Sequence, residues 1–449
     1  MKKSLYNTAG IYLTTFITVF LFLFIGRLPD LFSQTKFTLK ECIDYASKNH
    51  NIMQQQLLSK QKSLLDLDGA KKAILPEISA TIKANNNWGL YVDPVSNLIT
   101  RQRNIASSTN INLNMTLFSG WKNYYTIDLK NQSVTSADID KERNLRQISS
   151  AVVVAYYNVL MGKEQLSNAR KIKEEIEKEK KFIEGRVEKG FAHKRDLLSI
   201  DYQLSAISFT ETEAVNFIET SLFDLKQSAG INQADQIDLD EQQKDIKIEK
   251  CRLSLQSADS IALACSPEIE KARLDLKMAE STTMIAKSAR YPTLSLYSTI
   301  GTKTSTKKED PFNEQFRGNQ NQVLGLTLTV PVYSNNTISN SISSAELDTK
   351  LKQIDLSIIS EAVQRELKVA YLAVNSSYEK YGSLHKQYNA ADEEFKYSQK
   401  LFEIGNISSF EYSLVRNRLI NAQSALIQAK YDYLYRTKIL DLYLGKQIE

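Results

Sequence analysis

Two hydrophobic patterns alternate along this chain. Four short segments, at about 77–88, 109–118, 293–302 and 322–333, alternate apolar and polar residues with the period of two that indicates a strand. In the second segment the apolar positions are Ile111, Leu113, Met115 and Leu117, and between them stand Asn110, Asn112, Asn114 and Thr116. The proline-free spans 121–189 and 336–404 instead carry apolar residues at steps of three and four, interrupted by Glu179 in one and Ser398 in the other. That spacing predicts coiled-coil helices, each reaching about 100 Å if continuous.

Each long helical span is followed by a glycine, Gly190 in RVEKGFAHKRDLLS and Gly405 in LFEIGNISSFEYSL, 215 residues later. A glycine just past a helix end accepts the left-handed conformation that stops the helix. A second helix is expected a few residues on, and Ser408 with Glu411 has the spacing of a capping box. The sequence therefore predicts a helical hairpin whose tip lies at each glycine.

The same offset of about 215 relates other segments. AYYNVL at Ala155 matches AYLAVN at Ala370, LFSGWKNYY at Leu117 matches VYSNNTISN at Val332, and Pro76 matches Pro292 with an offset of 216. We interpret the chain as two copies of one unit, 34–228 and 257–449, joined by a polar connector, 229–256. Each copy is predicted to run helix, strand, loop, strand, long helix, turn, helix. The first helix should occupy 38–75, because Pro76 favours extended structure.

The polar faces of the strands leave two interpretations. A sheet on a soluble core is one, but asparagine is a poor strand former, and Asn110, Asn112 and Asn114 suit a water-filled pore. Strands of 9–11 residues match a tilted membrane crossing in a β-barrel. Aromatic residues that fit an interfacial girdle flank the strands: Trp88, Phe118, Trp121, Tyr124, Tyr125, Tyr291 and Tyr333. Four strands cannot close a barrel, so the barrel interpretation requires an oligomer: two chains would give eight strands and three would give twelve.

The N-terminus has the form of a targeting segment. Lys2 and Lys3 precede an apolar core, Ile11 to Ile25, and a small residue, Ser33, follows. Residues 1–33 are predicted to be a cleaved signal peptide, with an uncleaved signal anchor as the alternative. No later segment has 18 uninterrupted apolar residues.

Composition narrows the function further. Only 15 Gly and 7 Pro imply few turns, and 57 basic against 52 acidic residues do not suggest nucleic acid binding. Cys42, Cys251 and Cys265 lack the paired spacing of a disulfide framework or a zinc site, and the three histidines, His50, His193 and His385, are isolated. No nucleophile elbow or phosphate loop is found. An enzyme is therefore disfavoured, and no cofactor or metal is expected.

Taken together, these motifs resemble the TolC family of outer-membrane efflux proteins. The resemblance rests on the duplicated unit, the prolines before the strands, LFSG after a strand, and the spacing of Arg186, Gly190 and Asp196. It implies a mainly α-helical homotrimer with a twelve-stranded barrel in outer-membrane lipid and a periplasmic helical tunnel. Such a protein is the passive exit duct of a tripartite efflux or type I secretion system, working with a periplasmic adaptor and an inner-membrane pump. The alternative is a periplasmic coiled-coil scaffold without a pore.

The resemblance also assigns residues. The hairpin tips that would contact the adaptor include Arg186, Gly190, Phe191, Gly405 and Asn406, and the periplasmic gate candidates are Asp196 and Glu411. The second copy departs from the pattern. Leu401 stands at the position of Arg186, and Ile407 stands where some members carry an arginine that ties the gate shut. Glu411 can equally be a capping residue without any role in a pore.

Overall fold

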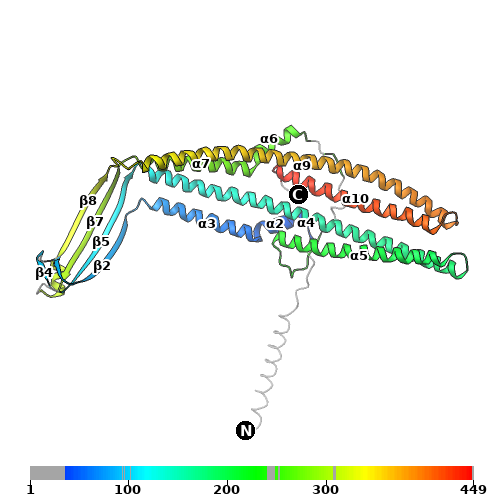
Figure 1. Cartoon of the computed structure of the whole chain (residues 1–449), viewed down its shortest axis with the longest axis horizontal. Helices are drawn as coiled ribbons and strands as arrows, with labels where there is room; N and C mark the ends of the chain where they lie inside the picture. Colours follow the sequence, from blue (N-terminus) through cyan, green and yellow to red (C-terminus); the bar gives the residue numbers. More distant parts are fainter. Residues whose placement is uncertain are drawn as a thin grey trace, which may run out of the picture.

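A computed structural model describes residues 36–93, 95, 97–101, 103–239, 248–250, 253–306 and 310–446. The predicted signal peptide, 1–33, and Cys251 lie outside these residues. The molecule is a long rod of helices with a β-sheet at one end and two helical hairpin tips at the other (Figure 1). In the described part of the chain, not one helix combines the length and apolar character that a membrane crossing needs.

The order of elements repeats, as the internal offset predicts. The first copy contains β1 (Lys36–Phe37), α2 (Leu39–Asn49), α3 (Asn51–Lys72), β2 (Glu77–Asn87), β3 (Leu90–Val92), β4 (Ile99–Arg101), β5 (Asn104–Ser119), α4 (Lys122–Glu188) and α5 (Lys194–Ala229). After β6 (Asp238–Leu239) in the connector, the second contains α6 (Leu255–Cys265), α7 (Pro267–Ser288), β7 (Thr293–Ser305), α8 (Phe312–Gly318), β8 (Gln320–Thr329), α9 (Thr337–Glu403) and α10 (Ser409–Tyr443). The two long helices, α4 and α9, have 67 residues each.

The predicted single helix 38–75 is in fact two helices, α2 and α3. His50 breaks it with an extended backbone, φ −65° and ψ 134°, and its Nδ1 accepts a hydrogen bond of 3.2 Å from the N–H of Ile52, which starts α3. The second copy breaks at the equivalent place. There Ser266 is extended because Pro267 follows it and disfavours helix in the residue before.

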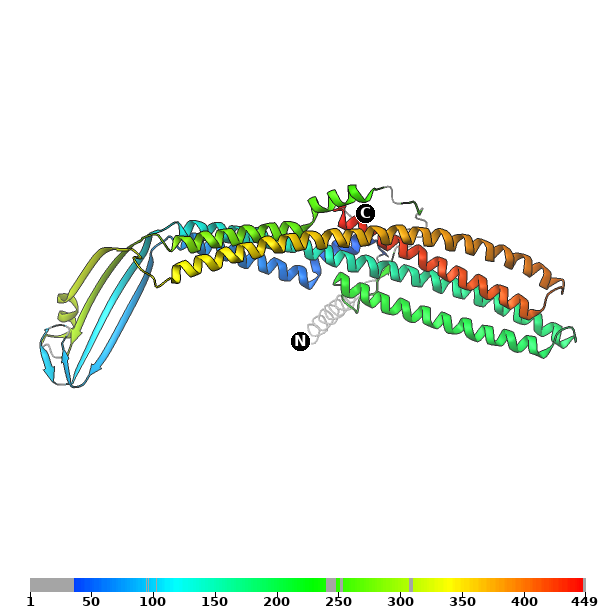
Figure 2. The ribbon, with the colours of Figure 1, turned by 45° about the horizontal axis from the view of Figure 1, so that its top comes forward.

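The sheet is antiparallel, with strand order β2-β5-β7-β8 (Figure 2). Its register places the apolar positions of all four strands on one face: Ala80 pairs with Ile111 and Ile111 with Ile300, while Leu296 pairs with Leu326. The asparagines of β5 lie on the other face, where Asn112 accepts a hydrogen bond from Thr299. A bulge between Thr116 and Phe118 corrects one detail, because Phe118 rather than Leu117 continues the apolar row, opposite Leu294.

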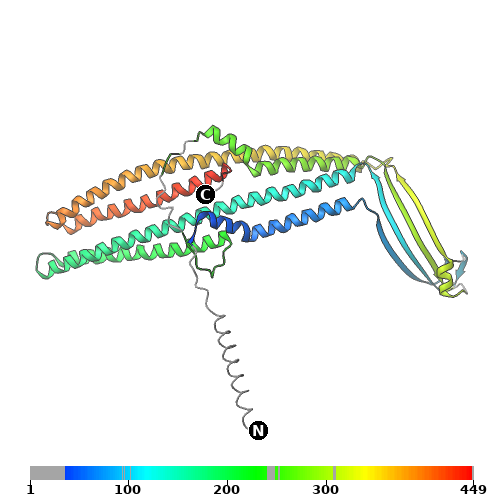
Figure 3. The same ribbon diagram turned by 180° about the vertical axis from the view of Figure 1, so that it is seen from behind.

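The helices follow the order of the strands. Beside the sheet, α3 packs on α4, α4 on α7, and α7 on α9. Toward the tips, α5 packs on α4, α4 on α10, and α10 on α9 (Figure 3). The helices therefore form one curved layer, which we call the wall. Within the chain, β2 with α3 lies at one lateral edge of this wall, and β8 with α9 lies at the other.

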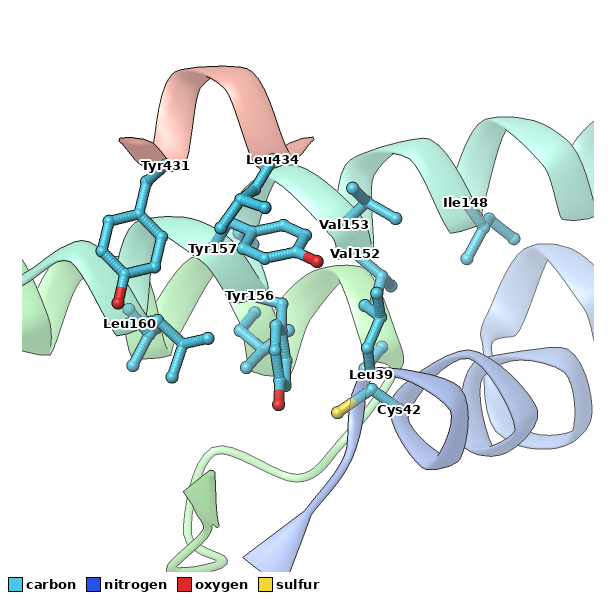
Figure 4. Close-up of a cluster of buried hydrophobic side chains, with 14 of the residues drawn as sticks. Leu39, Cys42, Ile148, Val152, Val153, Tyr156, Tyr157, Leu160, Tyr431 and Leu434 are labelled. Atoms are coloured by element: carbon cyan, nitrogen blue, oxygen red, sulfur yellow. The ribbon is translucent and has the colours of Figure 1, made fainter. Parts of the chain in front are cut away.

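A compact core stands midway along the rod, where the two copies meet. Leu39 and Cys42 of α2, Tyr156 and Tyr157 of α4, and Tyr431 of α10 are all nearly inaccessible to water (Figure 4). Burial raises the pKa of the Cys42 thiol to about 12, so this cysteine is an unreactive packing residue. Strand β6 of the connector pairs with β1 at this core, so part of the connector is ordered against the rod.

Candidate functional site

Both tip glycines hold the left-handed conformation. The φ angle is 76° at Gly190 and 82° at Gly405. The N–H of Phe191 donates to the carbonyl of Arg186 at 2.8 Å, and the N–H of Asn406 donates to the carbonyl of Leu401 at the same distance. These are matching Schellman motifs, so the two copies end their long helices identically.

The tips present apolar side chains to solvent. Phe191 is 72% exposed in one tip and Ile404 is 69% exposed in the other. A Cβ added at Gly190 or Gly405 would meet no atom within 4 Å. The glycines are therefore needed for their backbone conformation and not for lack of space.

The two acidic gate candidates occupy the same position in the helices that leave the tips. Oε2 of Glu411 accepts from the N–H of Ser408 at 3.0 Å, and the N–H of Glu411 donates to Oγ of Ser408 at 3.2 Å. The backbone hydrogen bond from Ser408 lowers the pKa of the Glu411 carboxyl. Oδ2 of Asp196 accepts a hydrogen bond from the N–H of His193 at 3.1 Å. Both acids thus act as helix caps, and the capping alternative has direct structural support.

Near the tips, a buried ionic cluster joins the two hairpins. The sequence patterns did not predict this cluster. Arg416 of α10, whose side chain is 3% exposed, forms an ion pair with Glu179 of α4, which is 10% exposed. The same guanidinium donates to Oε1 of Gln203 on α5. Burial raises the pKa of Glu179, and the charge of Arg416 opposes that rise. The acid that interrupts the predicted coiled-coil seam is therefore the partner of a buried arginine.

Aromatic rings complete this cluster. The ring of Tyr412 stacks on Phe402 at 4.6 Å between centroids and on Phe395 at 5.5 Å. The Arg416 guanidinium lies 5.2 Å from the centre of the Tyr412 ring. Burial raises the pKa of the Tyr412 hydroxyl to about 12. Arg416 and Tyr412 together tie α9 and α10 to the first hairpin.

Six of the predicted aromatic residues gather where the sheet meets the helices: Phe118, Trp121, Tyr124, Tyr125, Tyr291 and Tyr333. Most are exposed, from 39% at Phe118 to 80% at Tyr333. Trp88 lies apart from them, past the other end of β2, with the guanidinium of Arg103 6.0 Å from its ring centre. Exposed Phe312 and Phe316 of α8 also lie at that far end, so aromatic residues occur at both ends of the strands.

The glycine of LFSG has a structural reason at the junction of sheet and helices. At Gly120, with φ 63°, a Cβ would stand 2.5 Å from the carbonyl oxygen of Ser288 and 2.7 Å from Cβ of Tyr291. The backbone of the first copy therefore passes directly against the end of α7. Only glycine allows this close approach in this conformation.

Comparison with known proteins supports this architecture. Residues 260–446 match the family model described as Outer membrane efflux protein. The Campylobacter jejuni CmeC outer membrane channel superposes with a TM-score of 0.78 at 17% identity, covering 91% of this chain and 85% of that one. The chain has the fold of a TolC-type channel. CusC gives a TM-score of 0.77 at 15% identity, covering 92% of this chain and 93% of that one.

The Neisseria gonorrhoeae MtrE outer membrane channel, solved in an open state, gives a TM-score of 0.74 at 16% identity, covering 91% of this chain and 89% of that one. No curated protein matches the sequence of this chain. The family match spans most of the second copy, whereas the structural matches span both copies. The predicted TolC-like arrangement of duplicated strand and hairpin units is thereby confirmed.

Proposed function

We propose that this protein is the outer-membrane exit duct of a tripartite efflux or type I secretion system. It conducts substrates passively from an inner-membrane pump and a periplasmic adaptor to the outside of the cell. The observation that carries the proposal is the likeness of both copies, over about nine-tenths of the chain, to outer membrane channels. The sheet lies in the outer membrane, and the helices lie in the periplasm.

The sheet has the chemistry of a membrane wall. One face carries the row Phe118, Leu294 and Leu328, and the neighbouring row carries Met115, Leu296 and Leu326. Leu326 and Leu328 are 63% and 64% exposed in a single chain, which is costly in water but favourable against lipid. The opposite face, with its asparagines and threonines, then lines a water-filled interior.

The lateral edges support a closed ring of three copies. Within the described residues, β2 and β8 each have a strand neighbour on one side only. Below them, α3 exposes Leu57, Leu58, Leu64 and Leu65, and α9 exposes a stripe at Leu347, Leu351, Ile354 and Ile358. Because these surfaces lie at opposite edges, the contact between copies is head-to-tail, the kind that forms a ring when the rotation between copies closes. Three copies supply twelve strands, which is a sufficient number for a barrel.

The tips are the proposed adaptor contacts. Phe191 and Ile404 stand exposed at the ends of the two hairpins, beside Arg186, Gly190, Gly405 and Asn406. In this proposal Asp196 and Glu411 brace the closed tip by fixing the start of the returning helices α5 and α10. Their carboxylates also place negative charge near the proposed pore.

The decisive experiment measures assembly and conduction on one sample. The mature chain, purified in detergent, should have the mass of a trimer and should form ion-conducting pores in planar bilayers. Leu351→Asp should disrupt the trimer because it places a charge in the α9 stripe, whereas Gln353→Asp, two residues away on the same helix, should not. A water-soluble monomer that never partitions with outer membranes would instead favour the coiled-coil scaffold.

A further inference from the structure

The β3–β4 hairpin connects β2 to β5 in the sequence. It is located at the end of the sheet away from the helices (Figures 1 and 2). It is a short antiparallel pair in which Leu90 lies opposite Arg101 and Val92 lies opposite Ile99. In the proposed duct this is the outer mouth. The position of this hairpin therefore decides whether the mouth is covered.

A buried carboxylate anchors the hairpin to the sheet. Asp93, 1% exposed, directly follows β3. Its Oδ2 accepts a hydrogen bond of 2.8 Å from Nδ2 of Asn104 and another from Oγ of Ser305. Oδ1 of Asn104 in turn accepts from Ser305 at 3.0 Å and from Thr306 at 2.9 Å. The hairpin is thus joined to the ends of both β5 and β7.

The register shows which face of the sheet the hairpin covers. Asn110, on the polar face, lies opposite Gly301, and Ala106, on the same face, lies opposite Ser305. Because side chains alternate along a strand, Asn104 and Ser305 also belong to the polar face. The carboxylate of Asp93 reaches them there. The hairpin is folded over the polar face, which is the interior of the proposed duct.

The other outer loop goes to the opposite face. Thr302, on the apolar face of β7, donates a hydrogen bond of 2.9 Å to the carbonyl of Phe316 in α8. Helix α8 and its exposed Phe312 therefore lie on the lipid side of the sheet. The β3–β4 hairpin and the loop that carries α8 therefore cover opposite faces of the sheet.

The hairpin's free face is mainly apolar, with the exposed Arg101 beside Leu90 at one end of it. Leu90, Val92 and Ile99 alternate away from Asp93 and are 70%, 58% and 72% exposed; we call these three residues the hairpin patch. Such a patch would be out of place facing water in a polar channel. In a closed ring the polar faces all look toward the axis, so the surface opposite one hairpin patch is the hairpin patch of another copy.

We propose that the β3–β4 hairpin is a lid at the outer mouth, in which the hairpin patches of neighbouring copies meet at the axis. This inference rests on the proposed trimeric duct. A ring of apolar side chains blocks water and ions by dewetting until it is pushed apart. Asp93 holds the lid inward through its bonds to Asn104 and Ser305.

Disulfide trapping tests the lid. In a variant whose three native cysteines are replaced by alanine, Ile99→Cys is introduced, and the purified protein is treated with a mild added oxidant that converts paired thiols to disulfides. Cross-linked dimers should appear on a non-reducing gel. The matched control is Phe312→Cys, at a residue that is 66% exposed against 72% for Ile99 but lies on the lipid side, and it should not cross-link within a trimer.

The mass of the same sample separates the two hypotheses. Trimers that cross-link through Ile99→Cys and not through Phe312→Cys support the lid. Trimers without the Ile99→Cys cross-link overturn the lid and leave the duct standing, whereas monomers overturn both. Asp93→Ala in the Ile99→Cys chain should abolish the cross-link and raise single-pore conductance, and an undiminished cross-link would remove Asp93 from the role of anchor.

Discussion

Replacing Arg416 by methionine tests whether the buried ionic cluster binds the two hairpins together. The change keeps most of the side-chain volume and removes the guanidinium that contacts α4 and α5. Glu179, only 10% exposed, then loses the guanidinium that pairs with its charge. The hairpins should separate more easily near the tips.

The expected magnitude follows from the burial of both side chains. Removing one partner of a buried ion pair costs roughly 3–5 kcal/mol, because the remaining charge stays buried without compensation. Glu179 can relieve part of that cost by binding a proton, since burial already raises its pKa and the loss of Arg416 raises it further. We therefore expect a loss of about 3 kcal/mol at neutral pH.

The pH dependence has a definite sign. A carboxyl whose pKa is higher in the folded than in the unfolded chain favours folding at low pH, and this contribution is lost as the pH rises through its folded pKa. The loss in free energy of unfolding caused by Arg416→Met should therefore become smaller as the pH is lowered from 7 toward 4.5. Thermal unfolding of the detergent-purified protein, followed by circular dichroism, measures it.

Two companion variants make this test specific. Glu179→Leu combined with Arg416→Met should recover the lost stability, because replacing a whole buried pair with apolar groups is neutral or favourable by about 1–4 kcal/mol. Arg418→Met removes an exposed pair with Glu394 and should cost at most about 1 kcal/mol. Equal small losses for Arg416→Met and Arg418→Met, or a deficit that grows in acid, would refute the reasoning.

Three further predictions concern the sheet and the tips. Leu326→Arg should impair membrane assembly by roughly 2–4 kcal/mol, whereas Thr327→Arg, on the opposite face of the same strand, should assemble normally; equal yields of heat-resistant trimers would contradict the assigned faces. Gly190→Val and Gly405→Val should still give inserted trimers but lose efflux, since a β-branched residue resists the left-handed turn; normal efflux in cells carrying either variant would exclude the tips from docking. Glu411→Gln should lower thermal stability above pH 4.5, and its difference from the parent should shrink as the pH falls below 4.5, because a lowered carboxyl pKa stabilises only while the carboxyl is ionised; a difference that stays constant as the pH falls would rule out this account.

Periodicity and duplication were sufficient to predict most of the fold. The alternation in β5 and β8 identified the strands and their apolar face, and the two glycines located the tips. Local patterns failed where a single polar side chain decides the backbone, as at His50, which ends α2 without any proline. The bulge that moves Phe118 into the apolar row is likewise set by pairing with β7, which is remote in sequence.

Among the site residues, those set by local sequence were predicted and the one set by distant partners was not. Gly190, Gly405 and the capping position of Glu411 follow from short-range rules, so the sequence revealed them. Arg416 did not stand out because its partners, Glu179 and Gln203, come from helices more than 200 residues earlier. An acidic residue inside an apolar seam was the available signal, and it should be interpreted as evidence for a distant basic partner.

The equal lengths of α4 and α9 fix the distance between the sheet and the hairpin tips. Each helix has 67 residues, so both tips stand at the same distance from the sheet, about 100 Å at the rise of an α-helix. A deletion in one helix would leave its tip short of the other and would rotate every side chain beyond it. Only matched changes close to seven residues, made in both long helices and in the returning helices α5 and α10, preserve the level tips and the packing between helices. The gap that such a protein can bridge is therefore expected to vary among its relatives in whole heptads rather than continuously.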